Sequence, residues 1–334
     1  MFKEKKVKLA KNLIATALIV VSSMMFCGCQ SNTVDFKYKA KAGTIKEYKL
    51  TETNKLLSQK ANNKEDSQSQ LEQSINVIIS EETKSITDKG ERNIEISMSD
   101  ATMSRTVDGK TQEMPIPQMS EQKIKFKMTD KGVITEKDGT EVTDGSNDSD
   151  SIISIRFDDK PTTKGESWET KIEKTVPSSP FTTDKINIVK KYTFEGYEKY
   201  KNKSLAKITE KTATTVTKEF SNPPSKDKDQ EIPKMTSESK GDTTGTILFD
   251  VNQGCVVKAE RNSKITTSIT IDQSKMKNLS EEQKKNPVTK QEMTNESTMK
   301  YELIDNDSSN SSDTAKEEKK PEAKKEEAKK EDKK

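Results

Sequence analysis

The sequence predicts a mainly β protein, built as a single large, strongly twisted antiparallel sheet or half-barrel meander with at most one or two short helices. Apolar side chains recur at every second residue over long stretches, which is the spacing of half-buried strands. Between these stretches stand pairs such as Asp108-Gly109 and Asp138-Gly139, which supply the positive φ values that hairpin turns require. Successive hairpins produce an antiparallel meander.

Composition supports this fold class and excludes several kinds of function. Of 334 residues, 28% are hydrophobic and 34% are charged, whereas nearly half of an ordinary globular domain is apolar. This argues against a large dense core, a multi-span membrane protein and a tightly packed α/β enzyme. The chain contains no histidine, which removes the commonest general base, the Ser-His and Cys-His nucleophile pairs and most zinc sites. We therefore expect a protein that is not an enzyme and carries no cofactor or metal.

The first 28 residues are typical of a signal peptide. Five lysines precede an apolar run from Leu13 to Phe26, which is too short for a membrane span of about twenty residues. Gly28 and Cys29 follow, with Phe26 and Cys27 where Leu and Ala or Ser are usual, and the segment resembles the bacterial lipobox. The resemblance implies cleavage before Cys29 and a diacylglycerol thioether on that cysteine, whose two acyl chains suffice for stable anchoring. An uncleaved anchor or ordinary secretion is the alternative.

The anchor predicts a location and changes the charge of the chain. The lipidated protein would sit on the extracytoplasmic side of the cell membrane, or in the outer membrane if the source is Gram-negative. Removing residues 1–28 takes away five Lys and one Glu, so the net charge falls from +3 to −1. A nucleic-acid partner is not expected, because it would need a concentrated basic face.

The remaining chain divides into three parts. Residues 29–43 are expected to form the lipidated N-terminus and a tether, with Phe36, Tyr38 and Ala40 alternating at its end. Residues 44–304 form the β-rich domain, and residues 305–334 a disordered tail with balanced Lys and acidic residues. The clearest alternating stripes run through 94–107, with a bulge near Ser99 to Asp100, and through 124–128, 168–176, 186–194, 206–216 and 255–271.

Helix and loop signals are few. Ser280-Glu-Glu-Gln283 has the form of a capping box, so one short helix is expected between Met276 and Lys285. Glu195-Gly196 is expected to form a hairpin turn. Three stretches read as loop insertions at strand ends: Ser58–Gln70, Asp144–Asp150 and Ser221–Pro233.

Candidate sites in the body all have a plainer structural interpretation. An acidic cluster suggests calcium, but its spacing does not match a calcium loop; it comprises Asp144, Asn147, Asp148, Asp150, Asp158 and Asp159. Trp168 is expected to anchor the core, and the aromatic patch around Tyr192, Phe194, Tyr197 and Tyr200 to pack rather than to line a ligand mouth. Cys255 is expected to be a small strand residue rather than a nucleophile. A carboxylate pair of the glycosidase type stays open, since nothing singles one out.

Three segments resemble a family of uncharacterised bacterial lipoproteins, a domain of unknown function, that share a long strand meander. They are Ala42–Tyr48, Gly165–Trp168 and Gly245–Gly254, and the likeness spans residues 36 to 304. It implies no activity and no site residues. In outline the fold is also similar to bacterial lipid carriers that hold acyl chains on a concave face. We therefore expect a membrane-anchored binding module, with a lipid or other amphiphile as a possible ligand; a structural or protein-interaction component of the envelope, with a protein partner there, is the alternative.

Overall fold

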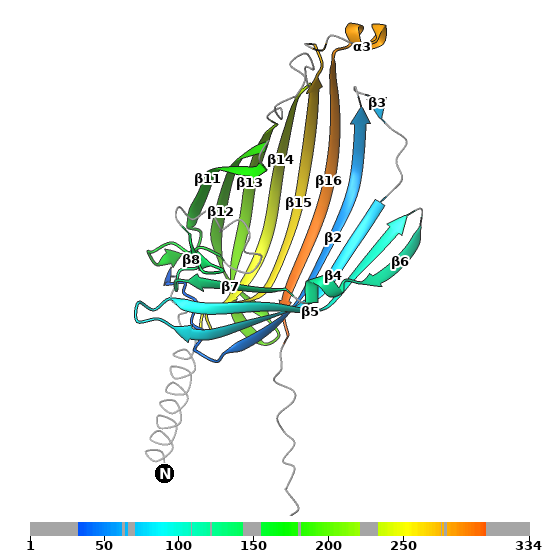
Figure 1. The fold of residues 1–334 in the computed structure, drawn as a ribbon. Coiled ribbons are helices and arrows are strands. Elements are labelled where there is room, and N and C mark those ends of the chain that lie inside the picture. Colours follow the sequence, from blue (N-terminus) through cyan, green and yellow to red (C-terminus); the bar gives the residue numbers. More distant parts are fainter. Residues whose placement is uncertain are drawn as a thin grey trace, which may run out of the picture. The chain divides into compact units, whose positions relative to one another are not determined.

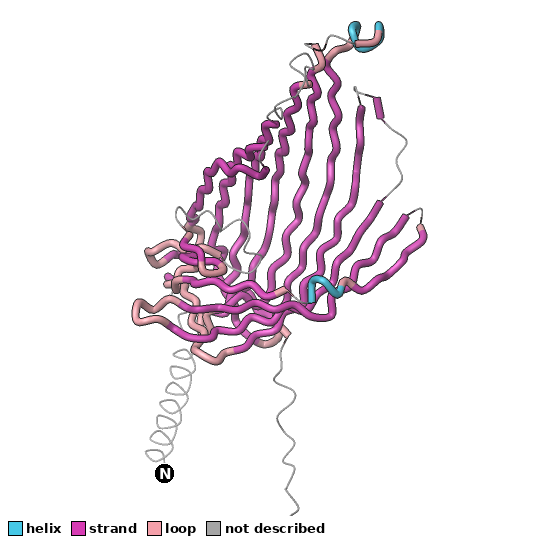
Figure 2. The backbone as a smooth tube through the Cα atoms, in the orientation of Figure 1, coloured by secondary structure: helices cyan, strands magenta, loops and turns pink. Residues whose placement is uncertain are grey.

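The structure is mainly β, as the alternating pattern predicts. The computed structural model describes residues 33–61, 64–65, 71–107, 109–120, 122–142, 155–179, 182–220, 233–274, 276 and 279–304. Nearly all strands join one antiparallel sheet of 14 strands, and long strands dominate it (Figure 2). The predicted single sheet is confirmed.

The long strands have between 13 and 19 residues. They are β2 (Ile45–Ala61), β4 (Leu71–Ile86), β5 (Arg92–Val107), β11 (Ser167–Ser179), β12 (Thr182–Tyr200), β13 (Lys203–Phe220), β14 (Lys234–Asp250), β15 (Cys255–Asp272) and β16 (Val288–Leu303). Shorter members are β3 (Lys64–Glu65), β6 (Lys110–Pro115), β7 (Lys123–Met128), β8 (Ile134–Lys137) and β9 (Thr140–Glu141). The remaining elements are a separate pair, β1 (Thr33–Val34) and β10 (Thr162–Thr163), and two short helices, α2 (Pro117–Ser120) and α3 (Glu281–Lys285).

The sheet is a meander whose two halves are joined through the chain's first and last long strands. Its order is β11-β12-β13-β14-β15-β16-β2-β4-β5-β7-β8-β9, with β3 beside β2 and β6 beside β5. The β16–β2 pairing, for example Tyr301 opposite Leu50, joins the halves. The sheet therefore stays open between β9 and β11 and curves without closing into a barrel (Figure 1).

Local predictions can be compared with the register of the strands. The bulge in β5 is confirmed, because its pairing with β4 shifts beside Asp100, which has a φ of 51°. The turn expected at Glu195-Gly196 is wrong. This pair lies inside β12, where the register with β13 shifts and Gly196 has a φ of 105°. A glycine with positive φ serves a bulge as well as a turn, so the residue pattern alone did not separate the two.

The helix prediction is confirmed at its cap. The Ser280 backbone N–H donates to Gln283 Oε1 at 2.9 Å, and the Gln283 N–H donates to Ser280 Oγ at 3.2 Å, which makes a reciprocal capping box. The loop expected over Ser58–Gln70 is wrong at its start, because β2 continues to Ala61 in register with β16. The expected loops over Asp144–Asp150 and residues 221–232 lie outside the described residues, as does the tail 305–334.

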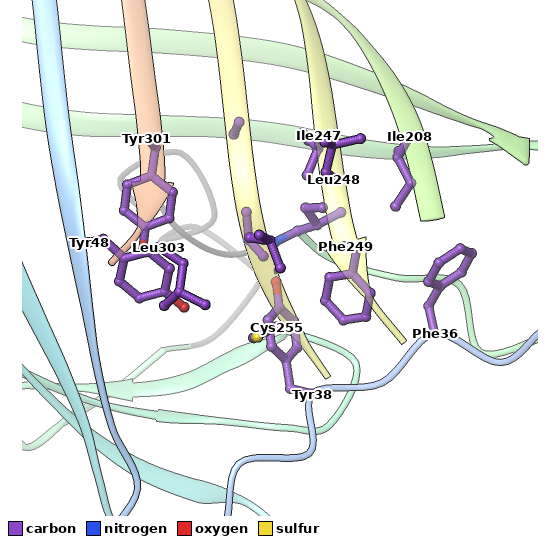
Figure 3. Packing of buried hydrophobic residues seen from close by; sticks show 14 of the residues in the cluster. Phe36, Tyr38, Tyr48, Ile208, Ile247, Leu248, Phe249, Cys255, Tyr301 and Leu303 are labelled. Atoms are coloured by element: carbon purple, nitrogen blue, oxygen red, sulfur yellow. Dashed lines mark hydrogen bonds between the residues drawn. The ribbon is translucent and has the colours of Figure 1, made fainter. Parts of the chain in front are cut away.

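A dense core fills one end of the sheet, which we call the base. The expected tether contributes to it: Phe36 and Tyr38 are buried, and Phe36 packs on Phe157, Phe194 and Phe249 with ring centroids 5.2, 5.3 and 5.9 Å apart. Figure 3 shows Phe36 and Tyr38 beside the last residues of β14. The alternation of Phe36, Tyr38 and Ala40 therefore reflects burial of these side chains in the base core, and the segment does not form a strand.

The base also links β11, at one edge of the sheet, to the turn between β7 and β8 near the other edge. The indole Nε1–H of Trp168 on β11 donates to the Arg156 carbonyl oxygen at 2.8 Å. The Phe157 backbone N–H donates to the Lys131 carbonyl, between β7 and β8, at 2.8 Å. The backbone N–H of Ile155 donates to the Tyr38 hydroxyl at 2.6 Å. Residues 155–157 therefore hold the β11 edge to the β7–β8 turn at this end.

The two faces of the long strands differ. The face that carries the base core, which we call the inner face, bears Ile208 and Ile247 in one cross-strand row. The opposite, outer face bears Lys, Glu and Thr with exposed ion pairs such as Lys300 to Glu260 at 3.8 Å. Such exposed pairs contribute about 0–1 kcal/mol each, so this face is mainly a hydrated surface.

Candidate functional site

The inner face changes character between the base and the opposite end of the strands, which we call the tip. At the base the inward side chains are buried, as with Phe194, Ile208 and Phe249. Toward the tip three large apolar side chains of the same face are exposed: Ile265 by 41% and Val176 and Met293 by 39% each. Among the described elements, the long strands in this half make their extensive contacts with their sheet neighbours. The tip half of the inner face is therefore uncovered in the described part of the chain.

An elongated hollow, which we call the slot, lies on this uncovered part. It has a volume of about 400 Å³ and follows β13, β14 and β15. Its lining is mostly apolar and small, and consists of Asp184, Thr214, Val216, Lys218, Phe220, Met235, Ser237, Ser239, Gly241, Ile265 and Ile269. Six residues of β13 separate Thr214 from Phe220, which gives a length of roughly 20 Å at 3.3 Å per residue.

Gly241 lines the slot at the end nearer the base. It lies in register between Thr214 on β13 and Ile265 on β15. A Cβ atom placed there would lie 2.9 Å from Ile265 Cγ1, so the Ile265 side chain uses the space above the glycine. Glycine inside a strand weakens it unless a close approach needs the room. The missing side chain lets Ile265 lean over β14 at this end of the slot.

A charged pair stands beside the outer part of the slot. Lys218 Nζ lies 3.5 Å from Asp184 Oδ2, and both side chains belong to the slot lining. Ser178 Oγ donates to Asp184 Oδ1 at 3.0 Å and holds the carboxylate in place. Lys218 keeps more than a third of its side chain exposed, so its ammonium group can reach a polar group above the slot.

A buried ion pair separates the slot from the base core. Arg261 Nε donates to Glu210 Oε2 at 2.7 Å across Gly245, with which both residues are in register. Thr212 Oγ1 donates to the other carboxylate oxygen at 3.1 Å. Burial alone would lower the pKa of Arg261, but the charge and hydrogen bond of Glu210 raise it above its usual value. The charged pair forms a polar boundary at the end of the slot nearer the base.

Gly245 is what allows this pair to form. A Cβ atom there would lie 3.1 Å from Arg261 Cγ and 3.5 Å from Glu210 Oε2. The two charged side chains therefore meet above a strand that has no side chain at that point. Gly241 and Gly245 are four residues apart in β14 and point to one face, so together they shape both the slot and its polar boundary.

The structure shows what the aromatic residues proposed from the sequence contact. Trp168 is buried and stacks on Tyr192 at 5.4 Å, which confirms its role as a core anchor. In the aromatic patch, Phe194 packs on Tyr197 at 5.7 Å and Tyr200 donates to Glu302 Oε1 at 2.6 Å, so the patch is used for packing. None of these residues lines the slot.

The candidate cysteine and acidic residues that the structure describes do not line the slot. Cys255 is the first residue of β15, and burial raises the pKa of its thiol. Cys29 lies outside the described residues, as do Asp144, Asn147, Asp148 and Asp150. Asp158 and Asp159 border a different hollow near Trp168. Among the described residues no group of three or more His, Cys, Asp or Glu side chains is placed to hold a metal ion.

Two buried carboxylates of the described chain, those of Glu210 and Asp250, have structural partners. Glu210 is engaged by Arg261 and Thr212. Asp250 Oδ1 accepts the backbone N–H groups of Asn252 and Gln253 at 2.9 Å each, and so closes the β14–β15 turn. These carboxylates therefore fix the sheet and its hairpin.

Comparison with known proteins adds no further assignment. No protein-family model matches the sequence, and no curated protein matches it either. In the described residues, none of the helices has the length and apolar character needed to cross a bilayer. The functional argument therefore depends on the slot and on the N-terminal sequence.

Proposed function

We propose that this protein is a lipid-anchored, extracytoplasmic binding module that holds one linear amphiphile on the inner face of its sheet. The observation that carries the proposal is the slot: a narrow, mainly apolar furrow on an otherwise uncovered face. Its volume of about 400 Å³ lies within the range of roughly 300–1,000 Å³ that is typical of ligand sites. A charged pair beside a long apolar furrow matches the two parts of an amphiphile.

The chemistry of the lining favours a hydrocarbon chain. Spread over roughly 20 Å, the slot has a mean cross-section of about 20 Å², which suits a single extended chain in van der Waals contact. Val216, Ile265 and Ile269 would bury the chain, and each CH₂ group removed from water gains about 0.8 kcal/mol. The head group would lie near Asp184 and Lys218, where it can exchange hydrogen bonds with both.

The anchor is a separate part of the proposal and is supported by the sequence of residues 1–29. The lysine-rich start, the short apolar run and Gly28-Cys29 favour lipidation of Cys29. The mature protein would then face the extracytoplasmic side of its membrane.

Binding can be tested on the chain that begins at residue 30, purified from a bacterial host without detergent. Native mass spectrometry should find a co-purified mass above that of the bare chain, and a fluorescent fatty acid should bind and brighten. A folded protein that carries no added mass and takes up neither the fatty acid nor a fluorescent phospholipid would contradict the binding function and favour a structural or protein-interaction role.

A matched pair of variants locates the site. Gly241→Leu would push Ile265 into the slot and should weaken probe binding by about fivefold or more, because overfilling costs at least about 1 kcal/mol. Ala213→Leu places the same leucine side chain nearby in β13, where Ala213 is exposed and its neighbour Thr214 lines the slot. This control should bind as the unmodified protein does; equal losses in both variants would exclude the slot as the site.

A further inference from the structure

Both ends of the described chain lie at the base of the sheet. Val34 and Phe36 belong to the base core, and β1 pairs with β10 through Thr33 and Thr163. At the other end of the chain, Leu303 pairs with Tyr48, and Tyr301 stacks on Tyr48 at 4.3 Å. The described chain therefore begins at the base, and its last strand, β16, ends there.

The distance from Cys29 to the base is short. Thr33 is four positions after Cys29, and four residue steps span at most about 14 Å when fully extended. The sheet is much longer, because β15 rises about 60 Å over its 18 residues from Cys255 to Asp272. A lipid on Cys29 therefore keeps the base close to the bilayer surface and leaves the tip free to rise far above it.

The slot lies in the distant half. Ile265, at its inner end, is ten residues from Cys255 and so about 33 Å along β15. Met235, at its outer end, pairs with Ile271, about 53 Å from Cys255. The slot therefore lies in the half of the sheet that ends near α3, far from the attachment point.

The rim of the base offers side chains suited to a membrane surface. We define this base rim as residues 41–45 and 86–90; the Gly43 N–H donates to the carbonyl of Thr83, three residues before Ile86, at 2.8 Å. Ile45 and Ile86 are exposed by 59% and 43%. Lys41 and Lys89 are also exposed. Apolar tips beside lysines are the combination that enters an anionic interface, where each lysine near the surface contributes about 1 kcal/mol.

We propose that the base rim rests on the bilayer that holds Cys29, so that the protein stands upright with the slot in the half of the sheet farther from that bilayer. The inference rests on the proposed lipid anchor and deepens the proposed function. It implies that the amphiphile is exchanged with an acceptor or donor beyond the anchoring membrane, because the slot stands about 30–50 Å above its surface. The competing arrangement lies flat, with Ile265 and Met293 on the bilayer.

Single tryptophan reporters in the full-length lipoprotein distinguish these arrangements. Ile45→Trp places the reporter on the base rim, Val288→Trp on the first residue of β16 at the tip, and Ile265→Trp in the slot. All three positions are exposed apolar strand residues, which makes them matched sites. The native Trp168 is buried in the base core and supplies a constant background.

The lipoprotein is reconstituted in vesicles of phosphatidylglycerol and phosphatidylcholine, with and without brominated acyl chains. The upright arrangement predicts a blue shift and loss of fluorescence for Ile45→Trp, while Val288→Trp stays as bright as in plain vesicles. Quenching of Val288→Trp, or an unquenched Ile45→Trp, overturns the orientation. Quenching of Ile265→Trp while Val288→Trp stays bright reports a brominated chain held in the slot and supports the proposal.

The intact mass of the same samples separates this failure from that of the anchor. A mass that includes a diacylglyceryl group on Cys29, together with quenching at the tip, overturns the orientation alone. A mass without that group overturns the anchor and the orientation with it, while binding to the soluble chain still tests the slot.

Discussion

At the scale of single residues, the ion pair between Glu210 and Arg261 has the largest predictable energetic effect. It is almost fully buried and crosses β14 above Gly245. Glu210→Ala should lower the free energy of unfolding by about 3–5 kcal/mol, because Arg261 is left as an uncompensated buried charge. Urea denaturation followed by circular dichroism measures the change.

A second variant tests the reason given for that loss. Replacing both partners, as Glu210→Leu with Arg261→Met, removes the stranded charge and should recover most of the lost stability. If the double variant is as unstable as Glu210→Ala, the cost comes from packing at this row of the sheet and the electrostatic explanation is wrong.

The raised pKa of the Glu81 carboxyl group should make the stability of the protein depend on pH. Burial raises the pKa of its carboxyl group in the folded protein, and the charge of Lys46 only partly offsets this. The folded state thus holds the proton more tightly than the unfolded chain, so stability is full below the ordinary pKa and falls as pH rises through the folded value. Glu81→Gln cannot ionise and should be more stable than the unmodified protein at pH 7.

The control for Glu81 is the acidic range. Below about pH 4 both proteins carry an uncharged side chain at position 81, so their thermal midpoints should converge. A difference between the two midpoints that stays constant from pH 4 to pH 8 would assign the effect to packing or hydrogen bonding instead of ionisation.

At the scale of elements, the β14–β15 turn holds the N-terminal segment in place. A Cβ atom on Gly254 would lie 2.4 Å from the Lys39 backbone nitrogen and 2.6 Å from the Lys37 carbonyl oxygen. Gly254→Ala should therefore displace residues 37–39 and cost more than about 3 kcal/mol of unfolding free energy. Gly139→Ala is the matched control, because Gly139 also has a positive φ but has nothing within 4 Å of its Cβ position.

The control separates backbone strain from lost packing. Gly139→Ala should cost about 1 kcal/mol from the positive φ alone. Equal unfolding free energies for the two variants, measured by urea denaturation, would mean that the N-terminal segment contributes little to the stability of the base.

The sequence predicted those elements whose alternation reflects burial. β15 was predicted from its stripe of odd-numbered residues and β5 together with its bulge, because inward apolar residues alternate with polar ones. β16 escaped prediction, since its side chains are mostly polar and Met293, Met299 and Tyr301 are widely spaced. Its strand conformation is instead fixed by pairing with β15 and β2, which a local pattern does not report.

The slot was not predicted for a related reason. Its lining comes from strands that are brought together only by the register of the sheet, and its apolar side chains are too sparse to form a stripe. A signal was nevertheless present: Gly241 and Gly245 stand four residues apart within a strand, and interior strand glycines mark close approach of a ligand or another chain segment.

At the scale of the whole molecule, stability is concentrated at the base. The largest fully buried side chains, such as Tyr48, Phe194 and Phe249, belong to the core there. Toward the tip the same strands carry half-buried or exposed side chains, as in residues 263–272 of β15. Because local opening costs least where few apolar contacts are lost, each long strand should be more easily opened at its tip end than at its base end.

Hydrogen exchange read out by mass spectrometry tests this gradient within single strands. Amides of residues 258–262 should exchange slowly, near the limit set by global unfolding, while those of 263–272 should exchange faster, although both stretches pair with β14 and β16. β13 offers an independent comparison between residues 203–212 and 213–220. Uniform protection along both strands would mean that the sheet opens as one unit, and the tip would then be a preformed rigid surface. A gradient that a bound fatty acid removes would instead show that the ligand supplies the apolar contacts missing from the tip half of the inner face.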